Sequence, residues 1–430
     1  MLDHMDLLGI AVVTAIVFLV VVFIGTVKNR PAVLAFLVGV TGVLMGIQVL
    51  QVHAFTITVV IWILFARRQF DPRSIRYIAP VLIASIILAT TALTGDLVAS
   101  PTLALQLLGL TVSASLIIAF STEADRRLMI FGMLTFATLS STLGLLQVAK
   151  IAPIEIWHAS VSALGRPIGL YSEPDWFGLF AGLGMVIAWR TPMRPTLRTI
   201  AITVNAAAFI LAFARAAWVA VGVSVVIVIV VAILRQRRVK KATKGRQAAV
   251  GLLALGATGV LLFLPQLVSD LTTRLANTLT PGAAGPDISG QARINQIASL
   301  TELANSAPYN GHGLSASGRV MVFGGIATGS SSNAVSSNWL LGLWVDGAFL
   351  SLPIIAVFII VALRTCHKLS GQLLVVVLLN SFFSNVFFTP ITWILLALCL
   401  ADLLVAKGDV LNSGDTRTAK VKGFRHQSAL

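Results

Sequence analysis

Residues 200–234 read IAITVNAAAFILAFARAAWVAVGVSVVIVIVVAIL, and Arg215 is the only ionisable residue among them. A guanidinium at membrane depth costs from about 3 to more than 10 kcal/mol, so an arginine kept there usually has a partner or a function. The run is too long for one membrane helix of about 20 residues but long enough for two short ones. It therefore predicts two helices, with Arg215 at a tight turn or helix start on one membrane face.

The composition extends this prediction to the whole chain. Of its 430 residues, 57% are hydrophobic and 11% are charged, and the mean hydropathy is +0.93, whereas soluble domains carry about 25% charged residues. Only helices and closed barrels satisfy the backbone in lipid, and the alternating pattern of barrel strands is not seen. We therefore expect an all-α polytopic bundle of transmembrane helices. The sequence MLDHMD has no basic region, which indicates a retained first helix instead of a signal peptide.

The apolar stretches predict about 12–13 helices. The predicted spans are 7–26, 32–49, 53–66, 78–94, 101–120, 128–149, 176–189, 199–213, 216–234, 248–265, 338–362, 371–386 and 388–405.

The basic residues predict how the bundle is oriented in the membrane. The net charge is +15, and 25 of the 31 lysines and arginines fall in alternate loops or in the C-terminal tail. The positive-inside rule places those segments in the cytoplasm, so the charge predicts membrane topology and needs no nucleic-acid partner. The exceptions, all assigned to the outer side, are Lys150, Arg166, Arg215, Arg274, Arg293 and Arg319.

Two outer segments are longer than simple connections. The first, with the start of the next helix, covers residues 150–178, and the second covers about 266–337. Long ordered loops usually carry function. Within the second, apolar residues recur about every third position between Gln291 and Ala304, which predicts a helix.

Four short motifs then resemble one known family. They are Phe-Ala-Arg-Ala-Ala-Trp at 213–218, Tyr-Ser-Glu-Pro-Asp-Trp-Phe at 171–177, Arg293 followed by Pro-Tyr-Asn-Gly-His-Gly-Leu at 308–314, and Ser-Asn-Trp-Leu-Leu at 337–341 with a later Asp-Gly. In order and spacing they resemble the motifs of the O-antigen ligase/polymerase family. Ala214 replaces the usual serine of the first motif, and Ser337 replaces the histidine of the last one.

The resemblance implies an organisation and an activity. N-terminal transmembrane helices would occupy 1–150, an O-antigen ligase-like core 151–365, C-terminal helices 366–406 and a cytoplasmic tail 407–430. Such enzymes lie in the bacterial plasma (inner) membrane. At its outer face they transfer a glycan from an undecaprenyl-pyrophosphate carrier to an acceptor hydroxyl on a glycan or a lipid. No cofactor or metal is expected, because preorganised cations can stabilise the pyrophosphate leaving group.

The outer arginines are the candidate pyrophosphate ligands, since arginine binds phosphate bidentately and stays charged. Arg215 and Arg293 are the first candidates, and Arg274 and Arg319 are further ones. Arg215 could instead be tied to helix-end carbonyls or to Asp346, and Arg293 could be a solvated loop residue. Arg166 and Lys150 are expected to be interfacial anchors.

The acceptor hydroxyl needs a general base within hydrogen-bond reach. A serine such as Ser337 cannot act alone as this base. The candidates, in rank order, are Glu173, His312 and Asp346, with Asp175 as a further outer carboxylate. Their alternative roles are a helix-start carboxylate, a turn histidine and a buried polar partner, respectively.

Three functions are open to such a chain. The absence of the ligase histidine at Ser337 favours a cell-surface polysaccharide polymerase. Ligase-type transfer to a lipid or another acceptor is the alternative within the enzyme class. A flippase or transporter of lipid-linked sugars is the alternative outside that class, although its charges would be expected nearer the midplane.

Overall fold

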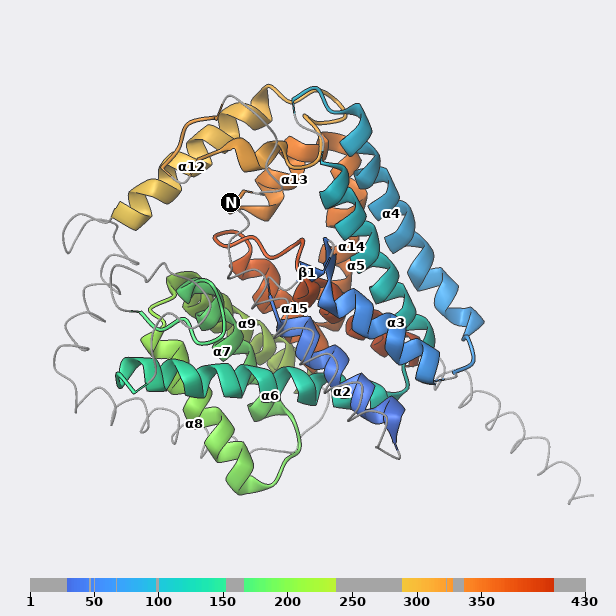
Figure 1. Ribbon diagram of the computed structural model, residues 1–430, viewed down its shortest axis with the longest axis vertical. Helices are drawn as coiled ribbons and strands as arrows, with labels where there is room; N and C mark the ends of the chain where they lie inside the picture. Colours follow the sequence, from blue (N-terminus) through green and yellow to red (C-terminus); the bar gives the residue numbers. More distant parts are fainter. Residues whose placement is uncertain are drawn as a thin grey trace, which may run out of the picture.

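The computed structural model describes residues 29–45, 48–49, 51–66, 68–97, 100–151, 166–236, 288–321, 323–327 and 336–405. This part of the chain is almost entirely helical, as predicted (Figure 1). The strands described are β1 (Gln48–Val49) and β2 (Val52–His53), which form an antiparallel hairpin. The predicted spans 7–26 and 248–265 lie outside the described residues.

The helices follow the predicted spans closely. The N-terminal part contains α2 (Arg30–Val43), α3 (Ala54–Ala66), η1 (Pro72–Ser74), α4 (Ile75–Thr94), α5 (Pro101–Phe120) and α6 (Glu123–Val148). Next come α7 (Pro174–Arg190), α8 (Pro195–Leu211), α9 (Arg215–Gln236), α12 (Ile288–Asn305) and η2 (Ala316–Arg319). The last are α13 (Trp339–Gly347), η3 (Ala348–Ser351), α14 (Leu352–Thr365), α15 (Leu369–Asn380) and the helix Pro390–Val405.

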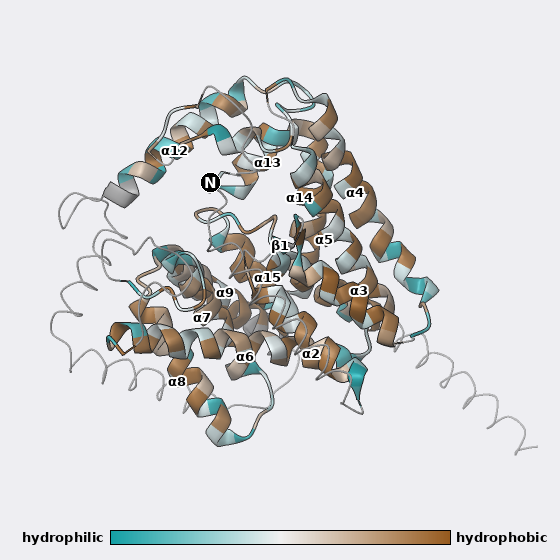
Figure 2. Cartoon of the chain, in the orientation of Figure 1, coloured by the Kyte–Doolittle hydropathy of each residue, from teal (hydrophilic) through white to brown (hydrophobic). Residues whose placement is uncertain are grey.

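Among the described residues, four segments are long and apolar enough to cross a membrane. They are Pro72–Thr94, Pro101–Phe120, Glu123–Val148 and Trp339–Thr365. Shorter apolar helices accompany them, including α2, α3, α8 and α15. Figure 2 shows hydrophobic residues along these helices and hydrophilic residues gathered at helix ends and on α12.

Three predicted spans differ from the structure in detail. The span 32–49 is wrong at its C-terminal end, because α2 ends at Val43 and residues 48–49 form strand β1. The span 338–362 is divided by the 3-10 turn η3, and Ala348 has a φ of +39° there. The span 371–386 is wrong at its C-terminal end, because α15 ends at Asn380 and a turn-rich segment follows. The last two breaks fall at polar residues that the predicted spans included, Asp346-Gly347 and Asn380-Ser381.

Small residues allow α2 and α6 to approach closely. A Cβ atom added to Gly39 would lie 1.8 Å from the Met129 carbonyl oxygen, and one added to Gly132 would lie 2.1 Å from the Phe36 carbonyl oxygen. Close backbone approach at small residues is a common way in which membrane helices associate, since lipid supplies no hydrophobic force between helices.

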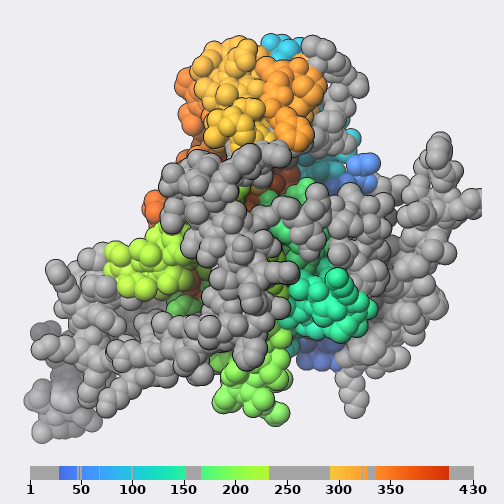
Figure 3. All heavy atoms as spheres, turned by 90° about the vertical axis from the view of Figure 1, so that its left-hand side faces the viewer, coloured from blue at the N-terminus to red at the C-terminus, as the bar shows by residue number. Residues whose placement is uncertain are grey.

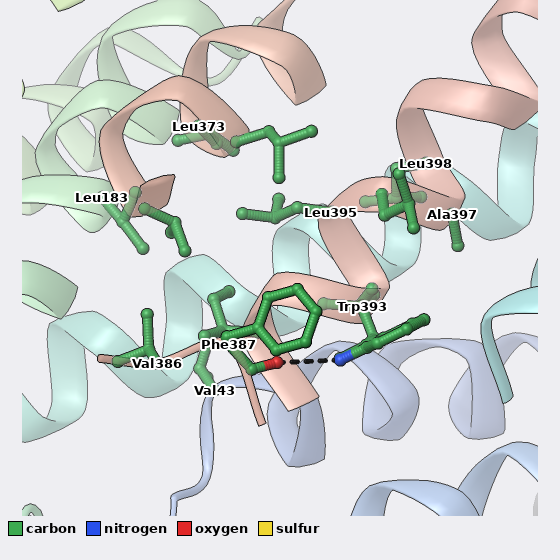
Figure 4. Packing of buried hydrophobic residues seen from close by; sticks show 14 of the residues in the cluster. Val43, Leu183, Leu373, Val386, Phe387, Trp393, Leu395, Ala397 and Leu398 are labelled. Carbon is green, nitrogen blue, oxygen red and sulfur yellow. Dashed lines mark hydrogen bonds between the residues drawn. The ribbon is translucent and has the colours of Figure 1, made fainter. Parts of the chain in front are cut away.

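The helix Pro390–Val405 forms the centre of the core. Every residue from Ile391 to Ala401 is buried. Figure 4 shows Leu395 of this helix near Leu373 of α15, with Ala397 and Leu398 farther along the helix. The Trp393 indole donates a hydrogen bond of 2.9 Å to the Phe387 carbonyl, which ties the helix to the turn before it.

The loops that carry the predicted cytoplasmic charges contact one another. Arg68 pairs with Asp125 at 3.2 Å, and Arg126 lies 3.6 Å from Asp402. Lys368 donates to the Asp402 carbonyl, and Arg190 donates to the His367 carbonyl. These bonds join the α3–α4, α5–α6, α7–α8 and α14–α15 connections with the end of the last helix. These contacts therefore group four of the loops that the charge pattern assigns to one side.

The region predicted to lie on the outer side is at the other end of the molecule. Helix α12, coloured yellow, and its neighbours form the top of the view in Figure 3. The predicted helix Gln291–Ala304 is confirmed as part of α12. Leu300 and Leu303 of α12 pack with Ala316 and Val345 in a small hydrophobic cluster of their own.

Candidate functional site

The turn between α8 and α9 begins the candidate site. Phe213 adopts a φ of +51°, and α9 starts at Arg215. The prediction of a helix start at this arginine is therefore confirmed. The turn packs against α7, because a Cβ atom added to Gly178 would lie 2.5 Å from the Cβ of Ala214. The half-buried Arg215 therefore directly follows a residue that packs against α7.

Asp175, in the first turn of α7, accepts hydrogen bonds from two arginines. One carboxylate oxygen lies 3.3 Å from Arg166 Nη1, and the other lies 2.8 Å from Arg293 Nη2. All three side chains are mostly buried, with 17%, 21% and 30% exposure for Arg166, Asp175 and Arg293. Charged hydrogen bonds of this kind are stronger than neutral ones. The two arginines come from the segment before α7 and from α12, so Asp175 joins distant parts of the chain.

Backbone carbonyls hold the same arginines from their other sides. Arg166 Nη1 also donates to the Phe213 carbonyl at 3.3 Å, and Arg293 Nη1 donates to the Phe383 carbonyl. Beside them, the Trp176 indole donates to the Ser384 hydroxyl at 2.9 Å. The α8–α9 turn, α7, α12 and the turn after α15 therefore meet at this ionic cluster, which we define as Arg166, Asp175 and Arg293.

Glu173 is the N-cap residue of α7 and lies beside the ionic cluster. The residue is exposed, yet the surrounding protein raises the pKa of this carboxyl above its ordinary value. The charge of Asp175 raises the pKa further, while Arg293 and Arg166 act in the opposite direction. Desolvation and a like charge both favour the neutral acid. Of the three base candidates, Glu173 is the one that the structure places beside the arginines.

His312 lies in a different environment. It is buried between Gly311 and Gly313, which have φ values of +75° and +100°. Its Nδ1 atom lies 2.9 Å from Asp96, and its Nε2 atom lies 3.2 Å from both the Leu303 carbonyl and the Ser306 hydroxyl. Both ring nitrogens therefore have protein partners, and the histidine joins the α4–α5 loop to the end of α12.

Asp346, near the end of α13, is 1% exposed. One of its oxygens accepts a hydrogen bond of 2.7 Å from the Ser317 backbone N–H. The Gly311 turn packs against it, since a Cβ atom added to Gly311 would lie 2.5 Å from the Asp346 carbonyl carbon. This is the buried polar environment that the sequence offered as the alternative to a catalytic role.

The remaining basic candidates have separate positions. Arg319 donates from Nε to the Ala327 carbonyl at 2.9 Å, within the 320–326 hairpin. Lys150 lies just after α6, is exposed and has a φ of +58°. Arg274 lies outside the described residues. The structure therefore groups Arg293 with Arg166, which the sequence analysis predicted to be an interfacial anchor. No local sequence pattern indicates this contact, because only the tertiary fold brings the two residues together.

Comparison with known proteins gives no assignment. No family model matches the chain, and no curated protein or solved structure is significantly similar to it. The function must therefore be argued from the residues and their geometry.

Proposed function

We propose that the protein is a membrane glycosyltransferase that acts at the outer leaflet. It would take a glycan from an undecaprenyl-pyrophosphate carrier and join it to an acceptor hydroxyl, as a cell-surface polysaccharide polymerase in a bacterial plasma membrane. In this orientation the C-terminus lies in the cytoplasm and the ionic cluster lies on the opposite side. The family resemblance of residues 171–177 and 213–218 motivates the substrate class.

The observation that carries the proposal is the arrangement of cations beside Glu173. Arg293 and Arg166 meet at the start of α7, and Arg215 begins α9 two residues after Phe213, whose carbonyl binds Arg166. Cations already in place stabilise charge that develops on a leaving group, which commonly contributes about 3–4 kcal/mol per donor in a site with little water. A departing pyrophosphate develops such charge.

The surroundings of Arg293 support a lipid-linked donor. Ile297 lies one turn from Arg293 on the same face of α12, and it is exposed, as are Ile294 and Phe383. An anionic headgroup with an apolar chain would contact both kinds of group. A free sugar nucleotide would leave the exposed apolar side chains in water.

Glu173 is the proposed general base. It would accept the proton of the acceptor hydroxyl while the acceptor oxygen forms a bond to the anomeric carbon. The bond between that carbon and the pyrophosphate oxygen breaks, and the arginines receive the released charge. A carboxyl whose pKa is raised is a better proton acceptor than an ordinary one, because base strength follows pKa.

The test is a reconstituted assay with an undecaprenyl-pyrophosphate glycan. Wild-type protein should lengthen or transfer the glycan, and Arg215→Ala and Arg293→Ala should each lower the rate by about 100-fold or more, as for the loss of a transition-state donor. Arg73→Ala, which removes an exposed arginine paired with Asp71, is the control and should act like wild type. Movement of the lipid between leaflets without glycan transfer would identify a flippase and refute the proposal.

A further inference from the structure

Two helical hairpins of the protein are built from helices too short to cross a membrane. Helices α2 and α3 have 14 and 13 residues, and α15 has 12. At 1.5 Å per residue they are about 21, 20 and 18 Å long, whereas the hydrocarbon core of a bilayer is about 30 Å thick. Helices α4 and α5, with 20 residues each, have the full length.

Contacts at the predicted cytoplasmic end show where the short helices begin and end. Arg68, just after α3, pairs with Asp125 in the first turn of α6. Lys368, just before α15, donates to the carbonyl of Asp402, and Arg126 lies 3.6 Å from the Asp402 carboxylate. The short helices therefore share one level at this end. Their opposite ends, at the β1–β2 hairpin and at residues 381–389, stop short of the level that α4 and α5 reach.

Gln106 of α5 gives the depth of the β1–β2 hairpin independently. Its side-chain amide donates a hydrogen bond of 3.1 Å to the side chain of Gln48 in β1. Gln106 lies five residues, or about 8 Å, along α5 from Pro101, and the preceding Ser100 N–H donates to the Leu314 carbonyl in the loop after α12. In Figure 1, β1 accordingly lies near the middle of the molecule, away from α12 and α13.

The hairpin is exposed and largely polar despite this depth. Gln48, Gln51 and Val52 are all exposed, and Gln51 adopts a φ of +66° at the turn. Non-helical backbone at membrane depth is tolerated only where it is buried in protein or lines a water-filled cavity. The hairpin is not buried in protein, so its surroundings favour water over lipid.

His53, in β2 opposite Gln48, has an unused hydrogen-bond acceptor. It is 5% exposed, and its ring is hydrogen-bonded to the Phe388 carbonyl in the segment 381–389. Its Nε2 atom has no partner within the described residues, so Nδ1 is the donor to Phe388. No carboxylate of the described residues pairs with the ring, and burial then favours the neutral imidazole, whose Nε2 can only accept. A buried acceptor without a donor costs about 1–3 kcal/mol.

We propose that the β1–β2 hairpin is the floor of a water-filled recess open on the side where α12 lies, and that His53 Nε2 accepts a hydrogen bond there from a hydroxyl of a neutral carbohydrate chain. Hydroxyl groups both donate and accept, which matches the His53 acceptor and the amides of Gln48 and Gln106. None of these three side chains is charged, so the floor offers no cation to a phosphate. The recess does not depend on the proposed function, whereas the assignment of the carbohydrate as the acceptor glycan rests on it.

Cysteine labelling tests the recess. In full-length protein with Cys366 and Cys399 replaced by alanine, Gln48→Cys should react with a membrane-impermeant methanethiosulfonate from the same side as Thr301→Cys on α12. The thiolate is the reactive form, and it forms in water and not in hydrocarbon. Leu139→Cys is the matched control, because Leu139 is also exposed and lies about 24 Å along α6 from the cytoplasmic end, a similar depth. It is on an apolar surface and should stay unlabelled.

Two substitutions of His53 test the carbohydrate. Asparagine can keep an N–H near the position of Nδ1 for the Phe388 carbonyl, but it has no acceptor at the position of Nε2. In the reconstituted transfer assay, His53→Asn should raise the KM for the acceptor glycan by about three- to tenfold, as for the loss of one hydrogen bond. The KM for the undecaprenyl-pyrophosphate donor should not change. His53→Gln, which places a carbonyl oxygen near the position of Nε2, should recover part of the loss. Each variant is first checked for wild-type elution and thermal unfolding.

Three results would overturn the proposal. They are absence of labelling of Gln48→Cys while Thr301→Cys reacts, equal labelling of Leu139→Cys, and an acceptor KM in His53→Asn that is unchanged or rises only together with the donor KM. Failure of the proposed function looks different. In that case no glycan is transferred and the assigned carbohydrate is lost with it, while Gln48→Cys is still labelled and the recess stands.

Discussion

Two effects oppose ionisation of the Glu173 carboxyl. They are desolvation by the surrounding protein and the charge of Asp175, two residues later in the chain. The folded protein therefore favours the neutral acid. The resulting stabilisation is fully present below the ordinary pKa of 4.5 and is lost as the pH rises through the higher folded-state value. The ionised Glu173 that the proposed catalytic role requires therefore lowers the stability of the folded protein at neutral pH.

Glu173→Gln tests both the cost in stability and the proposed catalytic role. The amide cannot ionise, so the variant should unfold at the same or a higher temperature than wild type at pH 8, and the difference should vanish near pH 4. Glycan transfer should fall by about 100- to 10,000-fold, the range for loss of a general base. The measurements are thermal unfolding in detergent and initial rates across pH.

The acid limb of the wild-type rate profile provides the control. It should have its midpoint above 4.5, because the carboxyl must lose its proton to act as a base and its pKa is raised. Retention of the wild-type profile in Glu173→Gln would assign the base to another residue. His312 and Asp346 would then need to be tested, although both are held by protein partners.

At the scale of elements, the contact between α2 and α6 depends on glycine. Gly132→Ala would place a methyl group against the Phe36 carbonyl, and backbone cannot move aside as a flexible side chain can. Overpacking of this kind costs about 1–3 kcal/mol, so the variant should unfold at lower temperature or denaturant concentration. Thermal unfolding of purified protein in detergent measures the change.

Gly222→Ala is the matched control for this prediction. It is also a helix glycine, in α9, but no atom of a neighbouring element lies within 4 Å of the added Cβ. The substitution should be neutral or slightly stabilising, because alanine favours a helix by about 1 kcal/mol over glycine. Equal destabilisation by both substitutions would mean that close packing of α2 and α6 does not explain the effect.

The sequence predicted elements better than it predicted their ends and contacts. The start of α9 was predictable, since one arginine divides an apolar run that is too long for a single helix. The break at Ala348 was missed, because the predicted span ran through the turn signal Asp346-Gly347 within an otherwise apolar stretch. Likewise, Arg293 and Asp175 are separated by 118 positions, so only the tertiary fold brings them together. Arg166 was missed for the same reason.

At the scale of the whole molecule, two groups of loops are joined by separate sets of polar contacts. One group includes Asp125 and Asp402 with their arginines, and the other includes Asp175 and His312 with their partners. The positive-inside rule assigns the first group to the cytoplasm. The proposed orientation can therefore be tested with one residue from each group.

Cysteine labelling provides this test. In a protein in which Cys366 and Cys399 are replaced by alanine, Thr301→Cys on the exposed face of α12 should react with a membrane-impermeant maleimide in intact spheroplasts. Arg73→Cys, beyond the end of α3, should react only after the membrane is permeabilised. The reverse pattern would place the ionic cluster on the cytoplasmic side and contradict the proposed outer-leaflet activity.

The buried position of the helix Pro390–Val405 has a consequence for biogenesis. The ribosome makes this helix after the other described helices that surround it, and its residues 391–401 fill the centre of their core. The earlier helices must therefore be made before the segment that fills their shared core. The core of the described helices can therefore close only after residues 391–401 have been made.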